Sequence, residues 1–301
     1  MRMRSAKSKA LLAMESVIAT GLIGISLGSQ YTLLALGFTL IFGILGVVNF
    51  AHGGFYVMGG YAAYYCNVVL GMPYPVAVIM AMFSMAALGW LFETLILERV
   101  IEDHQATLMV TMGFYLVMAT AILMIFGAES PQFSFPVTGV WRLGGIYFPY
   151  ANMIVLGACL AAIVFVYWLV YRTNIGRGMR AMSEDLPVAS ALGMRTKALF
   201  PFAFALATGL AGGTGALVTP ILALAPHVGD SVLAFSFLTV ILGGLGSVTG
   251  ATIAAFVVGL IEAYAAVYLG GSKGALTLFA LVLIILVVRP QGLLGKEVRR
   301  S

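Results

Sequence analysis

Long apolar runs are the feature that most constrains this chain. Several reach about 18 residues or more, the length that an α-helix needs to cross the roughly 30 Å hydrocarbon layer of a bilayer. The composition agrees, because 61% of the 301 residues are hydrophobic and 9% are charged. A soluble domain usually has about a quarter of its residues charged. The sequence therefore predicts an all-α polytopic membrane protein with a single transmembrane domain over residues 1–301.

We expect about 8–10 transmembrane helices, some of them broken. The predicted spans cover residues 10–28, 30–48, 52–70, 73–97, 105–127, 152–171, 200–220, a short 237–243, 251–269 and 275–288.

The distribution of lysine and arginine orients these spans, because cytoplasmic loops carry an excess of both. Following the chain through the ten spans places Arg99, the loop 172–199 and the C-terminal segment 289–301 on one side. Arg142 and Lys273 fall on the other side. The basic N-terminal segment 1–9, the loop and the C-terminal segment are accordingly predicted to be cytoplasmic. Topology then accounts for the net charge of +5 without a nucleic-acid partner.

The loop 172–199 is a polar segment between two apolar runs. Ser183 has the character of a helix N-cap, and Glu184 and Asp185 would follow in the first turn, where the helix dipole favours negative charge. Gly193 suits the left-handed position that ends a helix. The loop is therefore predicted to carry a short helix on the cytoplasmic membrane face, where a partner could grip it.

An internal repeat relates residues 41–64 to residues 241–264. Ten of the twenty-four positions match without gaps, including three aligned glycines. The predicted threading gives both copies the same orientation, so they would be parallel repeats related by an axis along the membrane normal. Duplicated halves are typical of transporters, whose sites lie where the halves meet, although some channels are duplicated too.

Both copies interrupt an apolar run with glycine and polar residues. Irregular backbone at membrane depth is tolerated where it is buried in protein or lines a wet cavity. We therefore take these residues as candidates for a substrate pathway, and they are Asn49, His52, Gly53, Gly246, Ser247 and Thr249. Alternatively, the glycines allow close helix packing and the polar side chains bond across helices. Glu262, deep in a later span, is a functional candidate by its depth or a contact with another subunit.

The motifs of an enzyme are missing from the sequence. It contains no GxxxxGK[ST] nucleotide loop, no HExxH motif and no paired Cys or His at metal-ligand spacing. The spans also lack the chain of Asp, Glu and His expected of a proton-coupled pump. Transport against a gradient would then need energy from another subunit, acting at the loop 172–199. A self-sufficient carrier or channel is the alternative, and it would leave that loop without a role.

Four segments carry a resemblance to a known family: residues 30–61, 176–194, 238–263 and 289–295. They resemble the permease subunits of branched-chain amino acid ABC importers, and the H-type (LivH-like) subunit more than its longer M-type partner. The most specific motifs are NFAHG at residues 49–53 and AMSEDL at residues 181–186. The basic segment 1–9 has no counterpart that we can map onto the family.

The resemblance implies a multi-pass subunit of a heteromeric importer in the lipid of the bacterial inner membrane. The expected partners are a homologous second permease, two cytoplasmic ATPases that hold ATP and Mg, and an extracytoplasmic solute-binding protein. This chain would hold no cofactor. Leucine, isoleucine and valine are the implied substrates, with other amino acids, amides, urea and aromatic acids as alternatives. The implied coupling helix, received by an ATPase, would contain Arg180, Ser183, Glu184, Asp185, Ala189 and Gly193.

Overall fold

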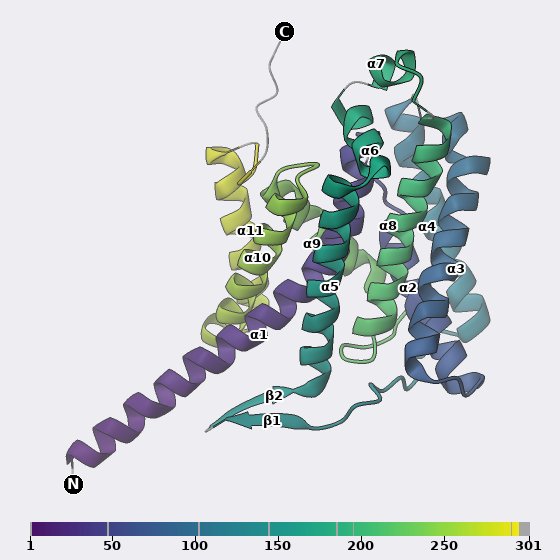
Figure 1. The fold of residues 1–301 in the computed structure, drawn as a ribbon. Helices are drawn as coiled ribbons and strands as arrows, with labels where there is room; N and C mark the ends of the chain where they lie inside the picture. The colour runs from purple at the N-terminus through teal and green to yellow at the C-terminus, as the bar shows by residue number, and fades with distance from the viewer. Residues whose placement is uncertain are drawn as a thin grey trace.

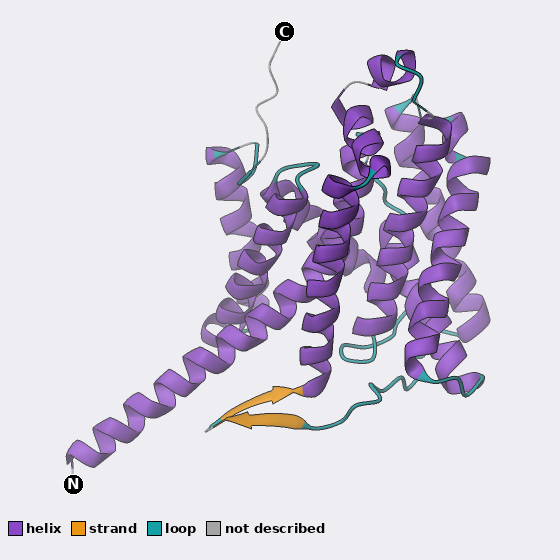
Figure 2. Ribbon diagram, in the orientation of Figure 1, coloured by secondary structure: helices purple, strands orange, loops and turns teal. Residues whose placement is uncertain are grey.

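Helices make up nearly all of the regular structure in the computed structural model, which describes residues 2–46, 48–101, 103–143, 145–184, 186–194, 196–289 and 291–294 (Figures 1 and 2). The helices are α1 (Arg2–Leu45), α2 (His52–Tyr64), α3 (Tyr74–Leu95), α4 (His104–Phe126), α5 (Tyr150–Arg172), α6 (Asn174–Glu184), α7 (Leu186–Ala191), α8 (Thr196–Val218), α9 (Val228–Gly243), α10 (Val248–Leu269) and α11 (Gly271–Val288). A π-helical turn, Tyr65–Val69, extends α2, and a 3-10 turn, Leu97–Arg99, follows α3. The strands β1 (Val140–Leu143) and β2 (Ile146–Pro149) pair as an antiparallel hairpin.

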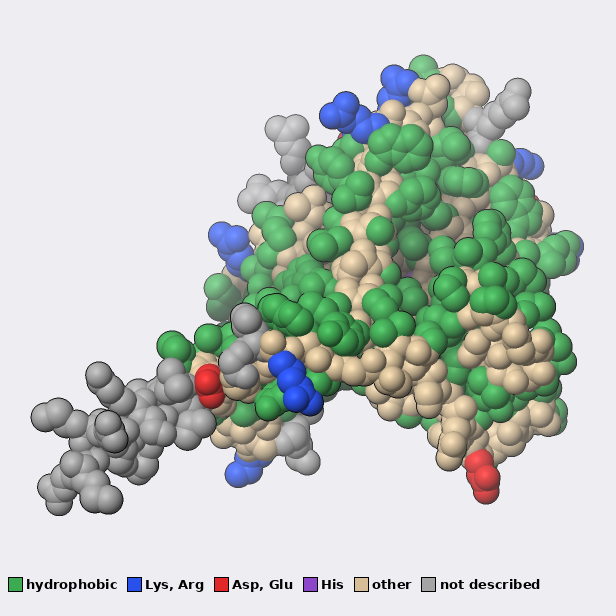
Figure 3. Space-filling model, turned by 60° about the horizontal axis from the view of Figure 1, so that its bottom comes forward, with side chains coloured by type: hydrophobic (Ala, Val, Ile, Leu, Met, Phe, Trp, Pro, Cys, Tyr) green, Lys and Arg blue, Asp and Glu red, His purple; other side chains and the backbone are tan. Residues whose placement is uncertain are grey.

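The prediction of an all-α polytopic membrane protein is confirmed. Within the described ranges, α1, α3, α4, α5, α8 and α10 are long and apolar enough to cross a bilayer. The shorter α2 and α9 lie among them, and α11 lies beside α10 at the edge of the bundle (Figure 1). Large apolar side chains face outward, such as Met124 and Ile125 with exposed fractions of 83% and 73%. Figure 3 shows hydrophobic side chains over much of one face, with few and scattered charges. Such a surface suits a lipid surrounding.

The N-terminal part differs from the prediction of two spans at residues 10–28 and 30–48, because α1 is one continuous helix of 44 residues. Gly24 and Gly28, near the expected turn, serve helix packing instead. A Cβ at Gly28 would lie 2.8 Å from the Cα of Phe256 in α10, and one at Gly24 would lie 2.8 Å from the Cα of Leu260. Small residues four apart let two helices approach closely. The glycines therefore bring α1 against α10 without ending the helix.

A helix that crosses the bundle once carries its two ends to opposite sides. The beginning of α1 lies at the end of the bundle that holds β1 and β2 (Figure 1). The helices α6 and α7 and the described C-terminal residues lie at the other end (Figure 1). The described C-terminal residues thus lie at the same end as the loop 172–199, as predicted, whereas the beginning of α1 lies at the opposite end instead of sharing it.

The internal repeat appears as two similar helix pairs, α1–α2 and α9–α10. Each pair is joined by a short non-helical segment that contains a glycine with positive φ, 67° at Gly46 and 80° at Gly246. The last turn of α1, just before the first segment, meets the second segment, because a Cβ at Gly43 would lie 3.4 Å from the Cα of Gly246. Both pairs thus turn at the same end of the bundle, as expected of a parallel repeat.

Candidate functional site

The segment between α1 and α2 enters the bundle as irregular backbone. Asn49 and Ala51 are buried, and the N–H of Phe50 is donated to the Oγ1 of Thr111 at 3.4 Å. Thr111 is the eighth residue of α4, so the contact lies about two turns inside that helix. Irregular backbone at this depth requires protein or water around it, and here it is packed in protein.

Asn49 and His52 are buried where α1, α2 and this segment meet. The Oδ1 of Asn49 accepts a hydrogen bond from the N–H of Ala51 at 3.0 Å. The Nε2 of His52 lies 3.2 Å from the carbonyl oxygen of Leu34, and its ring meets Phe38 edge-on. Neither side chain lines an open path in this conformation. Their pathway role stays a prediction; the contacts of His52 join α1 to α2, and that of Asn49 lies within the segment before α2.

Each of these two side chains keeps one buried polar atom without a partner among the described residues. The atoms are the Nδ2 of Asn49 and the Nδ1 of His52. A buried polar atom without a partner costs free energy. Both atoms are therefore available to a water molecule or to a second conformation.

Gly53 brings the beginning of α2 against the beginning of α9. A Cβ on Gly229 would lie 2.9 Å from the carbonyl oxygen of Gly53, a distance that leaves no room for a larger side chain. The two helices therefore begin side by side inside the bundle.

Gly246, Ser247 and Thr249 form a separate group at the beginning of α10. The Oγ of Ser247 accepts a hydrogen bond from the N–H of Gly250 at 3.0 Å, which makes Ser247 an N-cap. The side chain of Thr249 is exposed. The structure thus divides the six predicted pathway residues into two groups, one buried at α2 and one at the turn into α10.

Two hydrogen-bonded pairs were not predicted from the sequence. The Oη of Tyr31 donates to the Oε2 of Glu262 at 2.5 Å and links α1 to α10. The Oη of Tyr115 donates to the Oδ1 of Asp230 and links α4 to α9. Asp230 lies in the first turn of α9, which begins nine residues before the short span predicted at residues 237–243. An acidic residue just before an apolar run is the signal that could have placed this helix start.

The loop 172–199 contains two short helices, and the predicted N-cap at Ser183 is wrong. Ser183 lies in the last turn of α6, where its hydroxyl donates to the carbonyl oxygen of Arg180 at 2.8 Å. The cap is supplied ten residues earlier, because the Oγ1 of Thr173 accepts from the N–H of Gly176 at 3.0 Å. The helix starts early because its Met179 and Met182 can be buried against the bundle. Asp185 lies outside the described residues.

The predicted helix end at Gly193 is confirmed in its backbone geometry. Its φ is +79°, and the N–H of Met194 is donated to the carbonyl oxygen of Ala189 at 3.2 Å. This is the pattern of a glycine that closes a helix. Ala189 is buried, whereas Leu192 has an exposed fraction of 74%.

Contacts on two sides fix α6 to the bundle. Gly176 packs against the backbone of Leu169 and Val170 in α5, and a Cβ at Gly178 would lie 2.8 Å from the Cδ1 of Leu199 in α8. The exposed guanidinium of Arg180 lies 5.2 Å from the centre of the Tyr171 ring. The segment is therefore held by packing and by a cation–π contact.

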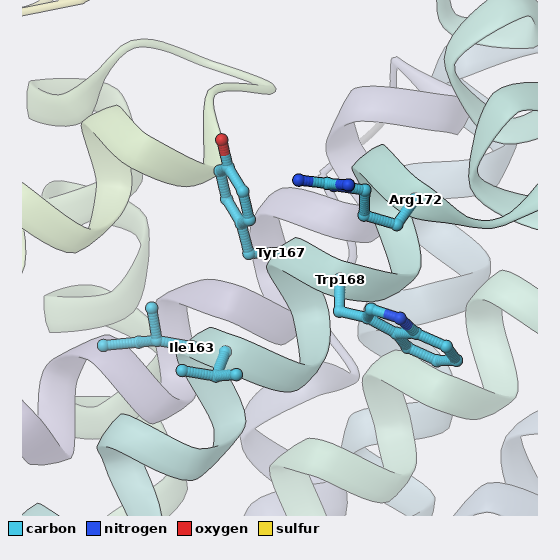
Figure 4. Close-up of a pocket in the computed structure, with 5 residues that line it drawn as sticks. Ile163, Tyr167, Trp168 and Arg172 are labelled. Carbon is cyan, nitrogen blue, oxygen red and sulfur yellow. The ribbon is translucent and has the colours of Figure 1, made fainter.

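Two cavities on the surface are apolar. One, of about 560 Å³, lies beside the end of α5, and in Figure 4 the Arg172 side chain extends toward Tyr167 while Trp168 points another way. Aromatic and basic residues at a helix end are typical of the membrane interface. The other, of about 960 Å³, is a groove between α3, α5 and α8 whose lining includes no charged residue. A zwitterionic solute would find no ionic partner in that groove.

A comparison with protein families gives a match over residues 21–288 to the family described as "Branched-chain amino acid transport system / permease component". The chain belongs to this family. The match covers the bundle from α1 to α11, both halves of the repeat and the segment of α6 and α7.

Among curated relatives, the permease is 27% identical to the high-affinity branched-chain amino acid transport system permease protein LivH of Salmonella typhimurium, over 91% of this chain and 94% of the relative. It is 25% identical to BraD of Pseudomonas aeruginosa, with the same two coverages. The LivM protein of Escherichia coli is 25% identical, and the match covers 94% of this chain but 72% of LivM. The predicted likeness to the H-type subunit is confirmed.

Among solved structures, the permease matches a chain of PsaBC from Streptococcus pneumoniae in complex with Fab. The TM-score is 0.45 at 14% identity, over 92% of each chain.

Proposed function

We propose that this permease is the membrane-spanning subunit of an ATP-binding-cassette importer that moves branched-chain or related amino acids into the cytoplasm. Its family supports a role in amino acid transport. The observation that carries the ATP-driven part is the α6–α7 segment, which lies outside the bundle at one end (Figure 1). ATP and Mg would be held by two partner ATPase subunits that receive this segment.

The way α6 is attached supports such a role. Met179 and Met182 are buried, and Gly176 and Gly178 pack against α5 and α8. A push on α7 would therefore reach α5 and α8 through packed contacts, which is the kind of route that carries coupling between distant sites. The exposed Leu192 gives a partner an apolar contact at the tip.

The remaining partners follow from the family and from the two ends of the bundle. A LivM-like second permease would pair with this chain in the lipid of the bacterial inner membrane. The end that holds α6 and α7 would face the cytoplasm, because Arg172, Arg177, Arg180 and Lys197 lie in or beside this segment. An extracytoplasmic solute-binding protein would then meet the end formed by β1 and β2.

Reconstitution of the complete complex in liposomes tests this function. The unmodified complex should take up leucine with the binding protein and ATP present, and Glu184→Lys should lower uptake at least tenfold while the complex still assembles. Gly193→Leu should act in the same direction, because a left-handed conformation costs a residue with a side chain about 1–2 kcal/mol. Leu283→Ala, at an exposed position of α11 that has no part in this proposal, is the control and should leave uptake unchanged.

Uptake by this chain alone, without ATP, would instead identify a stand-alone carrier or channel. Uptake of urea, an amide or an aromatic acid in place of leucine would keep the importer and change its substrate. Normal uptake in both Glu184→Lys and Gly193→Leu would contradict the coupling role of α6 and α7.

A further inference from the structure

An exposed carboxylate lies about halfway through the membrane-spanning part of this permease. Asp230 is exposed and accepts a hydrogen bond from Tyr115. Tyr115 is the twelfth of the 23 residues of α4, so this hydrogen bond lies about 17 Å from either end of the helix. Gly229, next to Asp230, also packs against the beginning of α2 inside the bundle. The depth of Asp230 is therefore fixed by two neighbouring helices.

The exposed face at the beginning of α9 carries polar side chains, whereas the outer face of the neighbouring helix α4 is apolar. His227, Asp230, Ser231 and Ala234 are all exposed, and their spacing places them on one side of the helix. We call His227, Asp230 and Ser231 the polar stripe of α9. The exposed residues of α4 include Met109, Val117 and Met124, with exposed fractions of 74%, 63% and 83%. Hydrocarbon can cover α4, but a carboxylate at this depth is too costly to leave against lipid.

Water or another protein surface must therefore cover the polar stripe. Since the family forms transport systems, the simplest occupant is the aqueous route along which the solute moves, closed on its far side by the second permease. We propose that the polar stripe of α9 lines this route and that the Asp230 carboxylate receives the ammonium group of the amino acid. The inference rests on the proposed function. It locates the route at the beginning of α9, whereas the glycine breaks alone did not show where the route runs.

The chemistry of the site fits a cation. The hydrogen bond from Tyr115 fixes the orientation of the Asp230 carboxylate, and the first turn of α9 favours a negative charge there. A charged hydrogen bond between an ammonium and a carboxylate is stronger than one between neutral groups. Leucine, isoleucine and valine share the ammonium group, so Asp230 would serve them all.

Cysteine accessibility in the assembled complex tests the route. In a background of Cys66→Ser and Cys159→Ala, Ser231→Cys should react with a water-soluble cationic methanethiosulfonate at least tenfold faster than Val117→Cys. Val117 is the matched control because it is exposed at a similar depth of the neighbouring helix α4. Adding Asp230→Asn should lower the ratio of the cationic to the anionic reagent rate about fivefold. Equal rates for Ser231→Cys and Val117→Cys would overturn the inference.

Transport gives the second measurement. Asp230→Asn should reduce leucine uptake at least tenfold while ATP hydrolysis and complex assembly persist, and Asp230→Glu, which keeps the charge, should retain more uptake. Unchanged uptake in Asp230→Asn would overturn the role of the carboxylate, and loss of the second permease from that variant would show that Asp230 is a subunit contact instead. Absence of ATP-driven uptake in the unmodified complex would reject the proposed importer, while the reactivity of Ser231→Cys would still decide whether the stripe is wet.

Discussion

At the scale of single residues, the polar groups inside this bundle are the most informative. Inside a membrane, water cannot supply hydrogen bonds to a polar side chain, so the side chain costs free energy unless another protein group bonds to it. Tyr31 and Glu262 meet this condition by bonding to each other across α1 and α10. Sequence position alone singled out Glu262, because an acidic residue in an apolar run is visible. Its partner was not visible, since 231 residues separate the two.

This pair gives a prediction about stability. Tyr31→Phe should lower the free energy of unfolding by about 1–3 kcal/mol, because it removes the hydrogen bond from the Oη of Tyr31 to the Oε2 of Glu262 and leaves the carboxylate without this donor. Thermal unfolding of the purified permease in detergent measures the change. Tyr31→Phe combined with Glu262→Leu should be more stable than Tyr31→Phe alone, since no unpaired group remains. A double variant as unstable as the single one would contradict this account.

At the scale of elements, the apolar runs predicted α3, α4, α5, α8, α10 and α11 closely, because a span must be long and apolar whatever its neighbours are. They did not predict the bounds of α1 and α9, because packing against neighbouring helices determines where these two helices begin and end. Glycine weakens a helix in water but permits close contact in a bundle. Residues near Gly28 were therefore assigned to a turn when they are a contact surface against Phe256 and Leu260.

The candidate site shows the same limit. The breaks were predicted near residues 46–54 and 243–250 from glycine and polar residues inside apolar runs, and the structure has non-helical backbone in part of each, at residues 46, 48–51 and 244–247. The side-chain contacts were not predictable, because they come from distant helices: His52 meets Leu34 and Phe38, and Asp230 meets Tyr115. The helix end at Gly193 was predictable because a helix end has local rules, whereas Glu184, expected in the first turn of a helix, is the last residue of α6.

The contact between α1 and α10 predicts an effect of glycine substitutions. A Cβ at Gly259 would lie 2.6 Å from the carbonyl oxygen of Gly24 and 2.7 Å from the Cα of Gly28. Gly259→Ala should therefore destabilise the permease by about 1–3 kcal/mol through overpacking, measured as a lower unfolding temperature. Gly113→Ala in α4 is the matched control, because nothing lies within 4 Å of its Cβ position. Its replacement should be neutral or slightly stabilising, and equal losses in both variants would refute the packing argument.

At the scale of the whole molecule, the continuity of α1 determines where the chain begins. With two spans before α2, segment 1–9 would share a side with α6 and α7. With one span, its described residues 2–9 lie toward the other end, the end that holds β1 and β2 (Figure 1). The basic residues at positions 2, 4, 7 and 9 then oppose the usual bias toward the cytoplasm, while packing of α1 on α10 favours the single crossing. The structure has the single crossing that packing favours. Chemical labelling can test whether α1 also crosses the membrane once in the cell.

Glu15 in α1 lies next to the turn of the β1–β2 hairpin, because a Cβ at Gly145 in that turn would lie 2.5 Å from a carboxylate oxygen of Glu15. This contact shows which residues of α1 lie at the hairpin end of the bundle. Met14, next to Glu15, is exposed. In the background of Cys66→Ser and Cys159→Ala, Met14→Cys should react with a membrane-impermeant maleimide in intact spheroplasts. Leu192→Cys, at the tip of the loop 172–199, should react only after the membrane is opened. If both required opening, α1 would have to turn back within the membrane, and its contacts with α10 through Gly24 and Gly28 would not survive in the cell.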